Sequence, residues 1–154
     1  MDIFRITGGK YASDLSGTGA RMYGGRWNPK GIAALYVTET PAQAMLEFLP
    51  HFPYTSMPNN LVLITIEAPD DLEIEEIKIA DLPPDWNSRP PAGGTENFGR
   101  QWLTRVAAAA LRVPSVMLPY GKAWNLVINP SHHQHSQLKI VEVMPVEIDP
   151  RLKK

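Results

Sequence analysis

Proline and glycine are frequent in this chain, and they limit the length of every helix and strand. The 154 residues contain 15 prolines and 11 glycines. Proline ends helices and is confined to sheet edges and bulges, and glycine weakens both kinds of element. This composition excludes a helical bundle or a coiled coil. We therefore expect short elements joined by ordered loops.

Charge and residue usage narrow the class of protein further. The chain has 15 basic and 16 acidic side chains, so no overall positive field attracts nucleic acid or anionic lipid. It has no cysteine, which excludes disulfides and thiolate chemistry and fits a reducing compartment. No segment approaches the ~20 apolar residues of a membrane span, and the first residues lack a signal-peptide pattern. We expect a soluble cytoplasmic protein that binds neither nucleic acid nor membrane.

The clearest helix signal begins at Thr40. Its hydroxyl can cap a helix, Pro41 suits the first helical position, and Gln43 completes a capping box. The pattern predicts a helix over residues 41–49, ended by a proline. Its expected core stripe is Ala42, Met45, Leu46 and Leu49. Glu47 is expected to point away from that stripe, and by itself it is typical of a solvated helix residue.

The remaining elements are one more helix and a set of strands. The helix is predicted over residues 96–112, with Trp102, Leu103, Val106, Ala110 and Leu111 on its core face. Six strands are predicted, over residues 33–37, 61–67, 73–79, 115–118, 124–128 and 138–144. Of these, 61–67 has the composition of a central strand and 73–79 that of an edge strand. Together they predict one α+β domain over residues 1–154, with curved, mainly antiparallel sheets and flanking helices.

Residues 8–31 hold seven of the eleven glycines, interleaved with arginines and aromatic residues. Flexible linkers lack such residues, so this segment is predicted to be an ordered loop. Within it, the sequence Gly24-Gly25-Arg26-Trp27-Asn28 places a guanidinium beside two glycines that let backbone N–H groups approach a phosphate. On the residue types alone, a structural turn with a surface arginine and a buried tryptophan is the favoured interpretation.

A second cluster, His132, His133 and His135, raises the question of a metal site. The chain has neither cysteine ligands nor a His-Glu-x-x-His pattern, and serine and glutamine are the neighbours of the three histidines. A polar loop between two strands explains the cluster, so no bound metal is expected. No Gly-x-Ser-x-Gly elbow supports a nucleophilic serine either.

Short motifs along nearly the whole chain point to one family when they are taken together. They are Phe4-Arg5, Asp14-Leu15-Ser16-Gly17-x-Gly19-Ala20, Gly24-Gly25-Arg26-Trp27-Asn28-x-x-Gly31, Leu35-Tyr36, Met45-Leu46-Glu47, Leu82-Pro83-x-x-Trp86, Gly99-x-x-Trp102-Leu103, Val113-Pro114-Ser115, Asn129-Pro130-x-His132 and Asp149-x-Arg151-Leu152. In this order and with these gaps, the chain resembles the RES-domain toxins of bacterial type II toxin–antitoxin pairs. These toxins are usually encoded beside an Xre-type antitoxin.

The resemblance implies a fold similar to that of ADP-ribosyltransferase toxins and an activity on NAD. The expected reaction breaks the nicotinamide–ribose bond, which depletes NAD and arrests growth. Water, inorganic phosphate or a protein side chain would accept the ADP-ribose, which gives a glycohydrolase, a phosphorylase or a mono-ADP-ribosyltransferase. The sequence does not decide among these acceptors. A cognate Xre-type antitoxin is expected to cover the cleft, and self-association is left open.

The family is named for an arginine, a glutamate and a serine, and the matching residues here are Arg26, Glu47 and Ser115. Glu47 is expected to stabilise an oxocarbenium-like transition state, Arg26 to hold the diphosphate, and Ser115 to orient a ribose or phosphate oxygen. The other expected substrate-binding residues are Gly25, Trp27, Asn28 and Tyr36. Two rival hypotheses are a non-catalytic protein-binding module and a metal-dependent hydrolase built on the three histidines.

Overall fold

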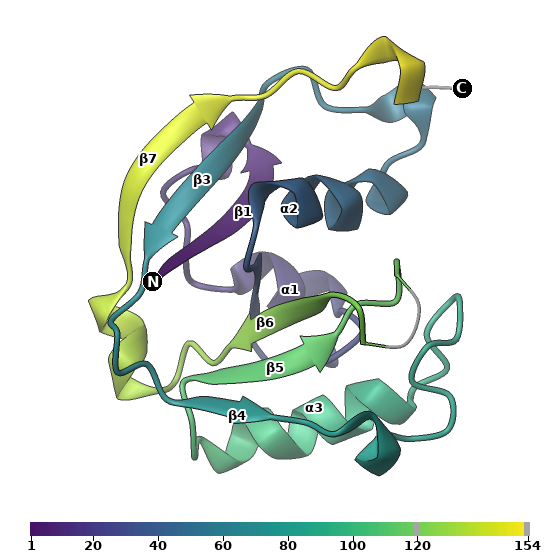
Figure 1. The fold of residues 1–154 in the computed structure, drawn as a ribbon, viewed down its shortest axis with the longest axis vertical. Coiled ribbons are helices and arrows are strands. Elements are labelled where there is room, and N and C mark those ends of the chain that lie inside the picture. Colours follow the sequence, from purple (N-terminus) through teal and green to yellow (C-terminus); the bar gives the residue numbers. More distant parts are fainter. Residues whose placement is uncertain (119–120, 153–154) are drawn as a thin grey trace.

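The computed structural model describes residues 1–118 and 121–152, which fold around one seven-stranded sheet. The strands are β1 (Asp2–Gly8), β2 (Leu35–Thr38), β3 (Leu61–Glu67), β4 (Ile74–Glu76), β5 (Ala110–Pro114), β6 (Trp124–Ile128) and β7 (Lys139–Pro145). Their order is β4-β5-β6-β2-β1-β3-β7, and only the β4–β5 pair is parallel among the named strands. The sheet is open and strongly curved, and its two halves splay apart (Figure 1). The predicted α+β class is confirmed.

The helices lie against this curved sheet. They are α1 (Thr18–Tyr23), α2 (Pro41–Phe48) and α3 (Gly94–Arg105), with short 3-10 helices at Gly9–Tyr11, Leu49–His51, Tyr54–Ser56, Ile79–Asp81, His133–Gln137 and Pro150–Leu152. Figure 1 shows α3 beside the β4–β5–β6 half and α2 beside β1. Helix α1 lies inside the glycine-rich segment that was predicted to be a loop. Within the described residues, every helix is too short or too polar to cross a bilayer.

Strand β1 is absent from the sequence prediction, although it lies near the middle of the sheet. It pairs with β3 along its whole length, from Asp2 opposite Glu67 to Gly8 opposite Leu61, and it meets β2 at Phe4 and Thr38. Its sequence mixes apolar residues with Arg5 and Thr7, both of which line a cleft. A strand that carries site residues on one face therefore lacks the apolar pattern by which strands are recognised.

The predicted helix over 96–112 is wrong at its C-terminal end. Helix α3 ends at Arg105, where Val106 adopts a left-handed conformation with φ of 52°. Residues 110–114 form β5 instead, and Leu111 is fully buried there. The apolar residues from 106 to 111 suit a buried strand as well as a helix, so periodicity alone cannot separate them. The strand predicted over 115–118 is wrong too, because this segment follows β5 without joining the sheet.

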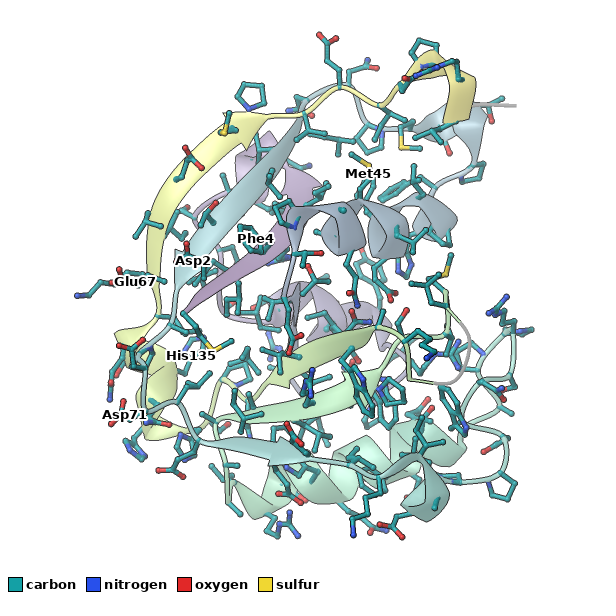
Figure 2. All side chains as sticks on the ribbon, in the orientation of Figure 1. Asp2, Phe4, Met45, Glu67, Asp71 and His135 are labelled. Carbon is teal, nitrogen blue, oxygen red and sulfur yellow. The ribbon has the colours of Figure 1, made fainter. Side chains whose placement is uncertain are left out.

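The core stripe predicted for α2 is wrong in part, because Met45 and Leu49 pack against the core while Ala42 is exposed. Ala44 and Phe48 are the buried residues of this helix, and they pack against Ile6 and Leu61 of the sheet. Phe4 and Met45 (Figure 2) pack partly buried against the same cluster. The stripe is rotated because the side of α2 that carries Gln43 and Glu47 faces strand β6 through polar contacts. Apolar spacing could not reveal such contacts.

The predicted N-cap of α2 is confirmed, but only half of the capping box forms. The Thr40 hydroxyl accepts a hydrogen bond from the backbone N–H of Gln43 at 3.2 Å. The side chain of Gln43 does not return to Thr40, and instead donates to the backbone carbonyl of Trp124 at 2.8 Å. Gln43, which was predicted to cap the start of α2, thus connects this helix to the sheet.

Candidate active site

A cleft of about 1560 Å³ opens where the two halves of the sheet diverge. Its walls come from α1, β1, β2 and α2 and from loops around residues 24–30, 89–91 and 113–117. The basic side chains on it are Arg5, Lys10, Arg26, Lys30 and Arg89, and the acidic ones are Asp14, Glu47 and Glu96. Basic groups thus dominate this surface in a chain whose net charge is −1. Such a cleft suits an anionic ligand.

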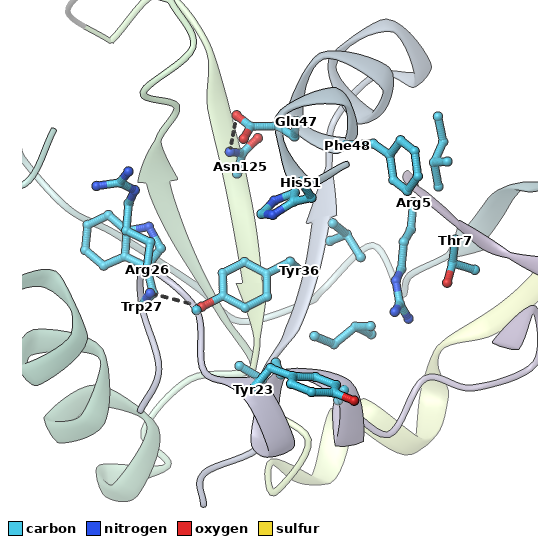
Figure 3. A pocket seen from close by; sticks show the side chains of 18 of the residues that line it. Arg5, Thr7, Tyr23, Arg26, Trp27, Tyr36, Glu47, Phe48, His51 and Asn125 are labelled. Carbon is cyan, nitrogen blue, oxygen red and sulfur yellow. Dashed lines mark hydrogen bonds between the residues drawn. The ribbon is translucent and has the colours of Figure 1, made fainter. Parts of the chain in front are cut away.

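Glu47 projects from α2 into the cleft (Figure 3). Its Oε1 accepts hydrogen bonds from Ser115 Oγ at 2.5 Å and from Asn125 Nδ2 at 2.7 Å. Hydrogen bonds to a carboxylate are shorter and stronger than those between neutral groups, so both contacts hold the side chain in one position. Among the described residues, no group donates to Oε2. The second oxygen is therefore available to a ligand in the cleft.

Ser115 lies behind this carboxylate, just after β5. Its side chain is nearly fully buried, its hydroxyl donates to Glu47, and it accepts the backbone N–H of Met117 at 3.0 Å. The observed contact of Ser115 is thus with Glu47. Its predicted contact with a ribose or phosphate oxygen would require the hydroxyl to leave that partner, so the geometry favours a positioning role.

Arg26 lies across the cleft from Glu47 in Figure 3. Its Nη1 donates to the backbone carbonyls of Trp86 at 3.0 Å and Ser88 at 2.9 Å. These bonds connect residues 24–28, the glycine-rich loop, to the segment before α3. Burial lowers the pKa of Arg26, and the nearby Glu47 carboxylate opposes that shift. An arginine remains protonated under such a shift. Within the described chain, Nε and Nη2 have no protein acceptor, so they can bind an anion.

Tyr36 holds the glycine-rich loop in shape. Its hydroxyl donates to Asn28 Oδ1 at 2.7 Å and accepts the backbone N–H of Trp27 at 3.0 Å. Burial raises the pKa of this hydroxyl, so it stays protonated. A Cβ atom on Gly25 would lie 2.6 Å from the same hydroxyl, which explains the glycine. Because the hydrogen of the hydroxyl is committed to Asn28, the ring of Tyr36 is the part that remains free to contact a ligand.

The side chains of Trp27 and Asn28 are buried. The Trp27 indole is 3% exposed and packs edge to face on Phe98, with 6.2 Å between ring centroids. The Asn28 amide is fully buried and donates to the backbone carbonyls of Ala20 and Ile32. Both side chains therefore stabilise the loop. A direct contact of either residue with substrate, as the sequence predicts, would have to come from the backbone.

The hydrogen bonds of the Tyr36 hydroxyl should stabilise the glycine-rich loop, and Tyr36→Phe tests this role. The substitution removes one hydroxyl and leaves the Asn28 oxygen and the Trp27 N–H without their partner. Such losses cost about 1–3 kcal/mol of unfolding free energy, which urea denaturation would measure. Tyr11→Phe is the matched control, because Tyr11 is 49% exposed and should change stability by less than ~0.5 kcal/mol. Equal stability of the two variants would contradict this role.

Sequence reasoning missed several residues at the site. Asn125 contacts Glu47 directly, and Gln43 contacts Asn125. His51, just after α2, and Arg89 also line the cleft. One signal was present for Gln43, because it lies one helical turn before Glu47 and so shares its face. Asn125 is a polar residue in an otherwise apolar strand, which was a second signal.

The three histidines lie in and beside a 3-10 helix over His133–Gln137. His132 is buried and its Nδ1 accepts the backbone N–H of Gln134, while His135 Nε2 lies 2.8 Å from the backbone carbonyl of Leu15. In residues 1–118 and 121–152, no group of three histidine, cysteine or acidic side chains could hold a metal ion. The His132 contact therefore caps the 3-10 helix, and the His135 contact connects this helix to the segment before α1.

The protein shares its fold with a known toxin–antitoxin structure and its family with the RES domain. A chain in the crystal structure of the M. tuberculosis MbcT-MbcA toxin-antitoxin complex shares the fold, with a TM-score of 0.73 and 22% identity over 99% of this chain and 86% of that chain. The RES domain matches residues 2–150. The chain therefore belongs to the RES-domain family, which confirms the resemblance seen in its motifs.

Two curated relatives are similar over most of their length. One is "Prs ADP-ribosylating toxin" of Sphingobium sp., which is 38% identical over 143 residues, or 92% of this chain and 88% of the relative. The other is "Toxin Res" of Yersinia enterocolitica, which is 37% identical over 155 residues, or 99% of this chain and 100% of the relative. The similarity thus spans the cleft and all the elements that form it.

Proposed function

We propose that this chain is the toxin of a bacterial toxin–antitoxin pair and that it consumes NAD in the cytoplasm by cleaving the nicotinamide–ribose bond. The observation that carries the proposal is the Glu47 carboxylate, which lines the cleft, is fixed through Oε1, and accepts no hydrogen bond at Oε2 from residues 1–118 and 121–152. The names of the two curated relatives support the toxin assignment. Loss of NAD would arrest growth.

The chemistry follows from the charge that develops during bond cleavage. As the nicotinamide–ribose bond breaks, both of its electrons leave with nicotinamide, which becomes neutral, and the ribose takes on oxocarbenium character. A fixed carboxylate such as Glu47 stabilises that cation. Nicotinamide needs no proton to leave, so the proposal requires neither a strong general acid nor a metal ion. The nucleophile then bonds to the ribose carbon and loses its proton to solvent.

The guanidinium of Arg26 would bind the diphosphate of NAD through Nε and Nη2, which face no protein acceptor in the described chain. Arginine suits this role because its planar fork of donors matches phosphate oxygens. Arg89 would add a second positive charge, since it lines the same cleft. The ring of Tyr36 would pack against the nicotinamide riboside, and Ser115 would act through Glu47.

The acceptor of ADP-ribose is the variable part of the reaction. Water gives ADP-ribose, and phosphate gives ADP-ribose-1″-phosphate. A protein acceptor is the second candidate function, which the name of the Sphingobium relative favours. Purified protein incubated with NAD, with and without phosphate, and then with tagged NAD and a cell extract separates the three products. A non-catalytic binding module predicts no loss of NAD in any of these reactions.

Arg26→Ala should raise the KM for NAD by about 10- to 100-fold, because a hydrogen bond to a charged group contributes about 1.5–3 kcal/mol. The value of kcat should fall less. Steady-state kinetics of nicotinamide release would measure both. Arg100→Ala is the matched control, because Arg100 is an exposed arginine on α3 outside the cleft. An unchanged KM in Arg26→Ala would count against its role in diphosphate binding.

The cognate Xre-type antitoxin is proposed to bind over the cleft and block entry of NAD. The M. tuberculosis structure contains a toxin-antitoxin complex of a chain with this fold, which supports such a partner. Co-purification of the two proteins and loss of nicotinamide release in the complex would test the proposal.

A further inference from the structure

A chain of hydrogen bonds runs from α2 through β6 and back to Glu47. Gln43 Nε2 donates to the backbone carbonyl of Trp124 at 2.8 Å and to Asn125 Oδ1 at 2.5 Å. Asn125 Nδ2 then donates to Glu47 Oε1 at 2.7 Å. Gln43 and Glu47 lie four residues apart on one face of α2, so this series of hydrogen bonds begins and ends on the same helix.

The carbonyl of Trp124, the first acceptor, determines how the amides of Gln43 and Asn125 are oriented. A backbone carbonyl only accepts hydrogen bonds, so the end of Gln43 that faces Trp124 must be its NH₂ group. The second hydrogen of that group requires an acceptor, which fixes the oxygen of the Asn125 amide on the Gln43 side. The NH₂ group of Asn125 must therefore face Glu47. If the Asn125 amide were reversed, an oxygen would face the carboxylate and would repel it.

We propose that Gln43 is a positioning residue for Glu47, and that it acts by orienting the Asn125 amide so that a donor always faces the carboxylate. The inference rests on the proposed function, since it describes how the same carboxylate is held in place at the cleft. Gln43 itself does not line the cleft. It acts on the reaction only through Asn125.

The variant Gln43→Glu tests this role, because it keeps the size of the side chain and removes its donor. An ionised Glu at this position is repelled by the Trp124 carbonyl and attracts the NH₂ group of Asn125. The amide then reverses and presents its oxygen to Glu47. We expect kcat for nicotinamide release to fall about 10- to 100-fold, with little change in KM, which is less than the ~10²- to 10³-fold effect of removing a preorganised group itself, because Gln43 acts on Glu47 only through Asn125.

The split between kcat and KM separates positioning from a general loss of structure. A disordered cleft would weaken NAD binding and raise KM, whereas a misdirected Asn125 amide affects only the step in which the nicotinamide–ribose bond breaks. Arg26 and Arg89, which line the same cleft and are proposed to bind the diphosphate, are unchanged in the variant. A fall in kcat at nearly constant KM therefore reports on the orientation of the Asn125 amide.

Two further variants complete the experiment. Ala42→Glu adds the same charge to an exposed position of α2 and should retain wild-type kcat and KM. Gln43→Met removes the amide without adding charge, and it should lower kcat about 3- to 10-fold, since Glu47 alone then orients the Asn125 amide and the oxygen of that amide loses its donor. Melting temperatures identify any variant that fails to fold, and Gln43→Met carries the test if Gln43→Glu unfolds.

The proposed function and the role of Gln43 are tested by different outcomes. If the wild-type protein releases no nicotinamide, the proposed function is overturned. If the wild type is active and folded Gln43→Glu or Gln43→Met keeps the wild-type kcat, the positioning role of Gln43 is overturned and the proposed function stands.

Discussion

Replacing Glu47 by glutamine should lower nicotinamide release by about 10²- to 10³-fold, which is the usual effect of removing one preorganised electrostatic group. The amide oxygen of the new side chain can still accept the hydrogen bonds of Ser115 and Asn125 at the Oε1 position. The fold and the side-chain position should therefore persist. At the Oε2 position, however, a neutral NH₂ group replaces half of a negative charge, and it cannot stabilise an oxocarbenium ion.

The control for this prediction is Glu76→Gln, which removes one exposed carboxylate from edge strand β4. It should leave the rate unchanged, and both variants should melt close to the wild-type temperature. Wild-type turnover in folded Glu47→Gln protein would remove Glu47 from the mechanism.

Gly99→Ala should cause the largest loss of stability. A Cβ atom at this position of α3 would lie 1.7 Å from the backbone oxygen of Trp27. Neither side can easily yield, because Trp102 and Leu103 are buried beside Gly99 and Trp27 is held by Tyr36 and the core. Overpacking of this kind costs about 3 kcal/mol, or roughly 6–12 °C in melting temperature. Activity should fall as well, since the displaced loop carries Arg26.

Gly19→Ala is the matched control for this substitution. Gly19 lies in α1, and a Cβ atom there would meet nothing within 4 Å. Alanine is the better helix former, so unfolding free energy should rise by about 0.5–1 kcal/mol. Differential scanning calorimetry of the two variants would compare them directly. A Gly99→Ala protein as stable as Gly19→Ala would show that α3 does not pack closely on the Trp27 backbone.

The sequence correctly predicted the strands and the helix start that are marked by a pattern of neighbouring residues. The bounds predicted for β3 and β6 are those observed, and β4 is an edge strand as expected. The N-cap of α2 was also predicted correctly, since Thr40 and Pro41 act within the first turn of the helix. Strand β1 was missed because its cleft face carries Arg5 and Thr7. The end of α3 was misplaced because one apolar run fits two kinds of element.

The candidate site depended on contacts that no local pattern encodes. Glu47 and Ser115 are 68 residues apart in sequence, and Glu47 and Asn125 are 78 apart. Taken alone, Glu47 has the pattern of a solvated helix residue, and only its resemblance to a family position drew attention to it. Gln43 and Asn125 stayed hidden because their role arises when α2 docks on β6. The glycine-rich loop was correctly predicted to be ordered and the burial of Trp27 was expected, but the burial of Asn28 required the structure.

This cleft is proposed to break the nicotinamide–ribose bond of NAD. The decisive quantity is the amount of free nicotinamide that the purified wild-type chain, separated from any antitoxin, releases from NAD over time. One nicotinamide should appear for each NAD lost, whichever acceptor takes the ADP-ribose. NAD that remains intact, or that disappears without release of nicotinamide, would show that the cleft does not carry out this reaction.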